Sequence, residues 1–180
     1  SYNGAVLGDG NLESHWVNDS KKVAINADIR KNNRRVALIG GGVYVTRDSL
    51  SFDMLADHVN IDFLKPFMSA FTSDVGGEAS GRVKLFGTFK DIDLKGSVLA
   101  DSICMKVDYT NVYYHGSDSV YIRPGYIDIP AFKLYDKYGN SAMLKGFVKH
   151  RYFHEPEFEF RLSGARDLLC FDTNNKINPD

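Results

Sequence analysis

The chain has 180 residues, and its 22 Lys and Arg nearly balance its 23 Asp and Glu, leaving a formal net charge of -1. This balance argues against nucleic acid as a partner, because nucleic-acid-binding proteins concentrate basic residues on one surface. No apolar run approaches the roughly 20 residues that a membrane-spanning helix needs, and the first residue is not Met. We therefore expect residues 1–180 to be a single β-rich unit, either a processed protein or a soluble segment of a larger protein.

Residues 1–59 have the spacing of a β-meander, with short apolar runs between turn residues. Lys31 to Arg35 (KNNRR) contains two Asn and predicts a hairpin tip rather than a nucleic-acid site. Gly40-Gly41-Gly42 is not a phosphate loop, because no Lys-Ser or Lys-Thr follows and the next residues (VYVTR) predict a strand. The expected strands are Leu12–Val17, Lys22–Ile29, Arg35–Ile39 and Val43–Arg47, with links at Asp9-Gly10, Asn18–Ser20, Lys31–Asn33 and Gly40–Gly42.

Residues 60–77 break this pattern and predict one short amphipathic helix and a link. Within Asn60 to Thr72, the apolar residues Ile61, Phe63, Leu64, Phe67, Met68 and Phe71 recur at helical spacing. Pro66 either starts or kinks the helix, and Gly76-Gly77 closes it. Such a helix would plug a core, dip into a membrane surface or cover the mouth of a groove.

Residues 78–172 predict the main β-sheet, and residues 173–180 a polar tail. Glu78 to Ala100 forms two alternating strands that turn at Lys90 and Asp91. The residues that share its apolar or bare face are Ala79, Gly81, Val83, Leu85, Gly87, Phe89, Ile92, Leu94, Gly96 and Val98. Later strands are expected at Ile103–Tyr113, Ser119–Arg123, Tyr126–Ile129, Ala131–Tyr135, Ser141–His150, Glu157–Leu162 and Leu168–Phe171, with turns at Gly116-Ser117, Arg123–Gly125, Lys137–Asn140 and Glu155-Pro156.

Candidate reactive residues are few, and we expect no catalytic residues, no metal and no cofactor. Cys104 and Cys170 lie in apolar stretches and predict two core thiols, with a disulfide between them as the alternative. His150 and His154, with Glu155 and Glu157, could bind a metal if they shared one strand face, but a solvated hairpin tip explains them better. No nucleophile elbow or zinc-binding His-Glu-x-x-His signature is present.

A mainly β chain with many one-sided strands and one helix predicts a curled antiparallel sheet of successive hairpins, whose apolar faces line a groove. Lipid is the natural occupant, because burial of each methylene is favourable. Glycines at Gly81, Gly87 and Gly96 are where we expect the sheet to bend. The residues expected to face lipid are Val83, Leu85, Phe89, Ile92, Leu94, Val98, Ile127, Ile129, Leu134, Leu144, Val148, Phe158, Phe160 and Leu162.

The chain contains Gly76-Gly77 and Gly81, followed by the segments DIDLKGSV, VDYTNVYYHGSDSVYI and LYDKYGNSAMLKGFVKHRYF. Through these residues, the chain from about Asn60 onward resembles the TamB branch of the AsmA-like proteins of Gram-negative envelopes. The matching positions are Gly87 and Gly96 around Leu94, Tyr113 before Asp118 and Val120, Asp136 with Gly139 and Asn140, and Gly146, His150 and Phe153.

This resemblance implies a non-enzymatic periplasmic segment of a protein anchored in the inner membrane. It implies a taco-shaped β-groove that transports phospholipid or helps outer-membrane proteins assemble, with phospholipid acyl chains and an outer-membrane assembly protein as partners. Asp136, Asn140 and His150 would set turns and strand ends. Two alternatives stay open: a closed β-sandwich or barrel for binding or adhesion, and a carbohydrate-active β-domain.

Overall fold

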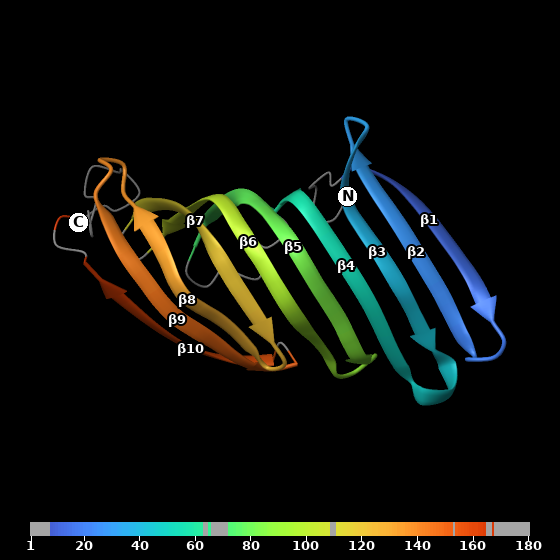
Figure 1. Cartoon of the computed structure of the whole chain (residues 1–180). Helices are drawn as coiled ribbons and strands as arrows, with labels where there is room; N and C mark the ends of the chain where they lie inside the picture. Colours follow the sequence, from blue (N-terminus) through green and yellow to red (C-terminus); the bar gives the residue numbers. More distant parts are fainter. Residues whose placement is uncertain are drawn as a thin grey trace.

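The computed structural model describes residues 8–62, 65, 72–108, 111–152, 154–164 and 167. These residues form one antiparallel sheet of ten strands, in which each strand pairs with its neighbours in the sequence. The sheet is curled and does not close into a barrel (Figure 1). The strands are β1 (Asp9–Val17), β2 (Lys22–Lys31), β3 (Arg34–Tyr44), β4 (Ser49–Asn60), β5 (Asp74–Thr88), β6 (Ile92–Val107), β7 (Val112–Arg123), β8 (Tyr126–Tyr135), β9 (Ser141–Arg151) and β10 (His154–Ser163).

The mainly β, curled antiparallel sheet predicted from the sequence is therefore confirmed. All ten described strands belong to one open sheet, so the closed sandwich or barrel is wrong for the described part of the chain. The predicted helix depends on Phe63, Leu64 and residues 66–71, which lie outside the described residues.

Several predicted links lie inside strands instead. Asp9-Gly10 belongs to β1, Gly40–Gly42 to β3, and Gly116-Ser117 to β7. Glycine weakens a strand through its backbone entropy and its lack of a side chain but does not forbid it, and Gly41 pairs with a neighbouring strand on each side. A short 3-10 turn over Val45–Arg47 follows β3, where a strand was expected.

The strand Ser49–Asn60 was not predicted as such, and Gly76-Gly77 lies in β5 rather than at a helix end. The expected strand Ile103–Tyr113 is interrupted by a turn, so that Val107 ends β6 and Val112 begins β7. Tyr126–Ile129 and Ala131–Tyr135 join into the single strand β8. The expected strand Leu168–Phe171 lies outside the described residues.

Several hairpin turns predicted from the sequence are present, and they contain the expected turn residues. Asn32 and Asn33 connect β2 to β3 with φ of 51° and 65°, the left-handed conformation that Asn tolerates in tight hairpin turns. Thr88 and Asp91 close the β5–β6 turn through a backbone hydrogen bond of 3.0 Å between Thr88 N and Asp91 O. Pro124 and Gly125 connect β7 to β8.

Candidate functional site

One face of the sheet is apolar across all ten strands, and we call it the apolar face. Directly paired residues in antiparallel strands point to the same side, so the register identifies its members. Phe52 pairs with Leu85, and Leu85 pairs with Leu94. One complete row runs Trp16, Val23, Val43, Leu50, Gly87 and Ile92, and the next runs Ile25, Gly41, Phe52, Leu85 and Leu94.

The second half of the sheet continues this face. Gly96 pairs with Ile122, Ile122 with Ile127, and Ile127 with Val148. The β9–β10 ladder adds Gly146 opposite Phe160 and Leu144 opposite Leu162. Adjacent positions such as Arg82, Lys84, Lys95 and Lys145 therefore lie on the other side, which we call the polar face.

The leucines show toward which side the sheet curls. Leu38, Leu55 and Leu99, all on the polar face, are exposed. Leucines of the apolar face in other inner positions, Leu85 in β5 and Leu94 in β6, are half-buried. A flat single sheet would expose both sides alike, so the sheet curls around its apolar face. At one end, Val112, Tyr114 and Ala142 form a small buried cluster with Val107 and Leu134.

The structure places most of the residues expected to face lipid on this apolar face. The register puts Val83, Leu85, Ile92, Leu94, Val98, Ile127, Ile129, Leu134, Leu144, Val148, Phe160 and Leu162 there. The backbone of Phe158 pairs with Val148. Phe89 differs, because it lies beyond the end of β5 in an exposed turn.

The sequence reasoning missed the contribution of the first three inner strands. Ile25, Ile39, Phe52 and Met54 lie in paired positions on the apolar face. Their alternation was visible in the sequence. The sequence does not extend the predicted face this far, because Gly40–Gly42 predicts a link and no strand is predicted over Ser49–Asn60, whereas the structure has strands at both.

Glycines bring the strands unusually close within this face. Gly81, Gly87 and Gly96 have φ of 157°, 128° and 152°, a region that side chains with a Cβ rarely adopt. A Cβ at Gly96 would lie 2.1 Å from the Arg82 carbonyl oxygen, and one at Gly87 would lie 2.1 Å from that of Asp91. At Gly146, a Cβ would meet the Glu159 oxygen at 2.2 Å. These positions have the geometry that a bending sheet requires.

Bulges provide a second source of curvature. The register shifts by one residue at Asp57–His58 in β4, at Asp101–Ser102 in β6 and at Pro130–Ala131 in β8, and such bulges bend a strand and increase its twist. In β8 the extra residue also explains why Ile129 and Leu134 share a face although one number is odd and the other even.

Neighbouring serines satisfy the backbone of two of these bulges. The His58 N–H donates to Ser80 Oγ at 2.8 Å, and the Ser102 N–H donates to Ser117 Oγ at 2.8 Å. Ser117 Oγ in turn donates to Asp101 Oδ1 at 2.7 Å, and this hydrogen bond lowers the pKa of Asp101. Asp57 accepts from His58 Nδ1 at 2.6 Å, which lowers the pKa of Asp57.

Asp136 and Asn140 form a tight turn between β8 and β9. The fully buried Asp136 carboxylate accepts hydrogen bonds from Tyr138 N at 2.8 Å, Asn140 N at 3.0 Å and Asn140 Nδ2 at 3.1 Å. Gly139 adopts φ of 84° within this turn.

A second clamp holds the β7–β8 turn. Asp93 Oδ1 accepts from Gly125 N at 3.2 Å, and the His150 N–H donates to the Gly125 oxygen at 2.9 Å. The His150 side chain is buried, so the solvated tip expected for it is wrong. His150 lies in β9 and His154 begins β10, so the two histidines lie in different strands.

The remaining candidate residues do not come together as a metal site in the described part of the chain. The described residues contain no group of three or more His, Cys, Asp or Glu that could hold a metal. Cys104 is a free thiol exposed on the polar face, so its expected place in a core is wrong. The extra residue at Asp101–Ser102 reverses the facing of β6 beyond that bulge. Cys170 lies outside the described residues.

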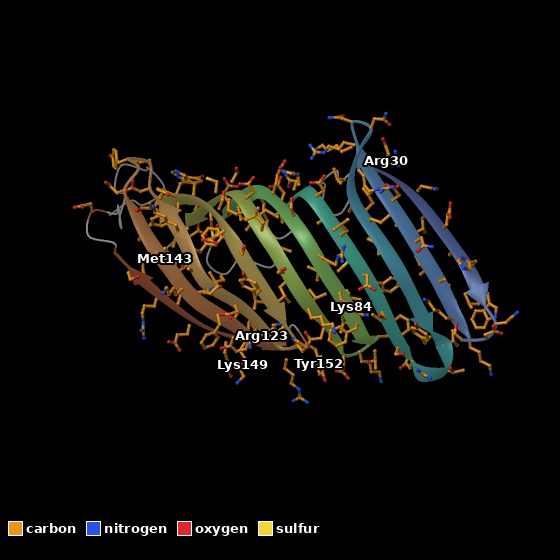
Figure 2. All side chains as sticks on the ribbon, in the orientation of Figure 1. Arg30, Lys84, Arg123, Met143, Lys149 and Tyr152 are labelled. Atoms are coloured by element: carbon orange, nitrogen blue, oxygen red, sulfur yellow. The ribbon has the colours of Figure 1, made fainter. Side chains whose placement is uncertain are left out.

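The polar face carries its own charge network at the β2–β3 hairpin. Asp28 Oδ2 lies 2.7 Å from Arg35 Nη2 and 3.2 Å from Arg30 Nη2. These two guanidinium groups, Arg35 first, lower the pKa of Asp28 to about 2. A shallow cavity of about 460 Å³ beside them is lined by Asp9, Gly10, Asn11, Asp28, Arg30 and Asn33, and Figure 2 shows Arg30 at this end of the sheet.

A search of the described residues for a helix long and apolar enough to cross a membrane finds none. Comparison of the chain with protein-family models, with curated proteins and with solved structures found no match.

Proposed function

We propose that this chain is a non-enzymatic groove segment whose apolar face holds the acyl chains of phospholipids. The observation that carries the proposal is the apolar face, which runs across ten strands and is interrupted by Ser14 in β1 and Asp118 in β7, while the opposite face carries most of the charge. Paired strands lie about 4.8 Å apart, so ten strands extend the face over about 43 Å. A face of this length suits hydrocarbon chains lying along the sheet better than one compact ligand.

The energetics favour an acyl chain over a polar ligand. Each buried methylene contributes about 0.8 kcal/mol, so a dozen methylenes contribute about 10 kcal/mol before ordering costs. A charged group placed on the same face would lose its hydration without a partner. The apolar rows contain glycine and aliphatic or aromatic residues, which leave an acyl chain free to slide.

The periplasmic location, the anchorage of a larger protein in the inner membrane and the role in phospholipid transport rest on the resemblance to the TamB branch. A role in outer-membrane protein assembly is the second candidate. It is favoured by the sheet edges, because β1 and β10 each have a neighbour on only one side among the described strands. An unpaired edge can accept a strand of a client protein.

Lipid occupancy is tested with two matched variants of one strand. Leu94 lies on the apolar face of β6 and Leu99 on the polar face. We expect the purified chain to carry phospholipid in native mass spectrometry. Leu94→Asp should remain folded but bind a fluorescent fatty acid at least tenfold more weakly, which corresponds to a loss of about 1.4 kcal/mol of binding free energy.

Leu99→Asp should bind the probe like the unmodified chain. A delipidated protein that fails to bind acyl-chain probes would contradict the proposal. Unfolding of Leu94→Asp, with Leu99→Asp intact, would instead indicate that the apolar face is a packed core. To test the assembly role, an unfolded outer-membrane β-barrel protein should crosslink to residues of β1 or β10.

A further inference from the structure

Five hairpin turns lie along one edge of the sheet, which we call the lower edge. They connect β1 to β2, β3 to β4, β5 to β6, β7 to β8 and β9 to β10, and they line the bottom of the molecule in Figure 1. In a meander, every second turn falls on the same edge. Residues that are far apart in the sequence are therefore brought into one row.

Four of these turns present a large apolar or aromatic side chain to solvent. Trp16, Val45, Phe89 and Tyr152 are between 39% and 60% exposed. Val45, Phe89 and Tyr152 lie in the turns themselves, and Trp16 lies at the end of β1. On the opposite edge, Tyr138 lies in a described turn, Tyr113 near the start of β7 and Leu162 near the end of β10, and all three are exposed. The lower edge thus carries a row of exposed apolar side chains, a feature typical of interaction sites.

A cation accompanies each of these side chains. Lys21, Arg47, Lys90 and Arg151 lie within a few residues of them, and none of the four makes a salt bridge within the described part of the chain. Residues 18–22, 45–48, 89–91, 123–125 and 150–152 contain six Lys and Arg against three Asp. Of the six, Arg123 contacts Asp128 at 3.5 Å.

On the opposite edge, several cations form salt bridges. Arg30 and Arg35 are both held by Asp28, Arg34 by Asp57, and Lys65 by Asp74 at 3.2 Å. Figure 2 shows Arg123, Lys149 and Tyr152 gathered near the lower edge, with Arg30 at the other. Lys31 on the opposite edge also makes no salt bridge with the described residues, but four other cations of that edge are paired, whereas Lys21, Arg47, Lys90 and Arg151 of the lower edge are not.

We propose that the lower edge docks on the surface of a lipid bilayer that contains anionic lipids. Aromatic side chains favour the interface between headgroups and acyl chains, and Lys and Arg beside them are attracted to anionic headgroups. The turns would insert shallowly, as interfacial elements do, without crossing the bilayer. This surface shares Trp16 with the apolar face, and Ile92, Ile122 and Ile127 of that face lie next to it.

Vesicle binding tests the proposal directly. The chain should co-sediment with vesicles of phosphatidylcholine mixed with phosphatidylglycerol and far less with phosphatidylcholine alone, and raised salt should weaken the binding. Trp16 is the only tryptophan. Its fluorescence should therefore shift to the blue on binding and be quenched by brominated lipid.

Two variants of the lower edge are compared with one of the opposite edge. Phe89→Ser combined with Tyr152→Ser, and Arg47→Gln combined with Lys90→Gln, should each weaken vesicle binding roughly tenfold. Tyr138→Ser should leave it unchanged. All three should retain the fluorescent fatty acid, so that loss of docking is distinguished from loss of the groove. Equal binding to neutral vesicles, absence of binding, or an equal loss in Tyr138→Ser would overturn the proposal.

Discussion

Gly96 is a position where the backbone itself demands glycine. Its φ of 152° and the Arg82 oxygen, 2.1 Å from where a Cβ would lie, leave no room for a side chain. We expect Gly96→Ala to lower the free energy of unfolding by about 1 to 3 kcal/mol, the usual cost of a strained backbone. Urea unfolding followed by circular dichroism measures this loss.

Gly10 provides the matched control for this prediction. A Cβ at Gly10 would lie 3.9 Å from Ile29 Cγ1, in ordinary contact. Gly10→Ala should therefore be neutral or slightly stabilising. Equal effects at the two positions would show that the sheet does not bend at Gly96.

Asp28 predicts a particular response to acid. Its pKa in the folded chain is lowered to about 2 by Arg35 and Arg30, against about 3.9 in an unfolded chain. A carboxylate with a depressed pKa contributes stability above its unfolded pKa, and this contribution is lost as the pH falls through about 2. In Arg35→Gln, an NMR titration should show the pKa of Asp28 moving upward.

The same variant should lose less stability between pH 4 and pH 2 than the unmodified chain. Arg34→Gln is the control, because Arg34 pairs with Asp57 instead. A pKa of Asp28 that is the same in Arg35→Gln as in the unmodified chain would show that the Asp28–Arg35 contact is not maintained in solution.

At the scale of the elements, the bulge in β6 depends on one hydroxyl of β7. Ser117 Oγ accepts from the Ser102 N–H and donates to Asp101. We expect Ser117→Ala to reduce the free energy of unfolding by about 1 kcal/mol, because water replaces part of the lost hydrogen bonding at this exposed site. The pKa of Asp101 should rise, since its strongest stabilising partner is removed.

Ser119 lies two residues further along β7, and its backbone N–H donates to the Asp118 carboxylate at 2.7 Å. Ser119→Ala should therefore leave both stability and the pKa of Asp101 close to their original values. Hydrogen exchange at the Ser102 amide separates the two variants, because only Ser117→Ala should accelerate it.

For the whole molecule, a single curled layer predicts an extended shape. A compact globular protein of this length would have a radius of gyration of about 16 Å. Ten strands side by side span about 43 Å across the sheet, so small-angle X-ray scattering should give a larger radius than the globular value. A globular profile for the isolated chain would mean that the sheet folds onto itself in solution.

The sequence alone determined the secondary-structure class and the polarity of the strands. The alternation in Glu78 to Ala100 identified both strands and their shared face, because a period of two is a local property of the chain. The turns at Asn32-Asn33 and at Asp136 to Asn140 were equally local, since Asn, Asp and Gly adopt the required backbone conformations by themselves.

Only the tertiary structure decided register, bulges and the extent of the face. A bulge at Pro130–Ala131 keeps Ile129 and Leu134 on one side, and the bulge at Asp101–Ser102 turns Cys104 to the polar side. Gly40–Gly42 could form a strand because β2 and β4 pair with it on both sides. These outcomes depend on hydrogen bonds between segments distant in the chain, and a local pattern of residues carries no record of which neighbour a strand will meet.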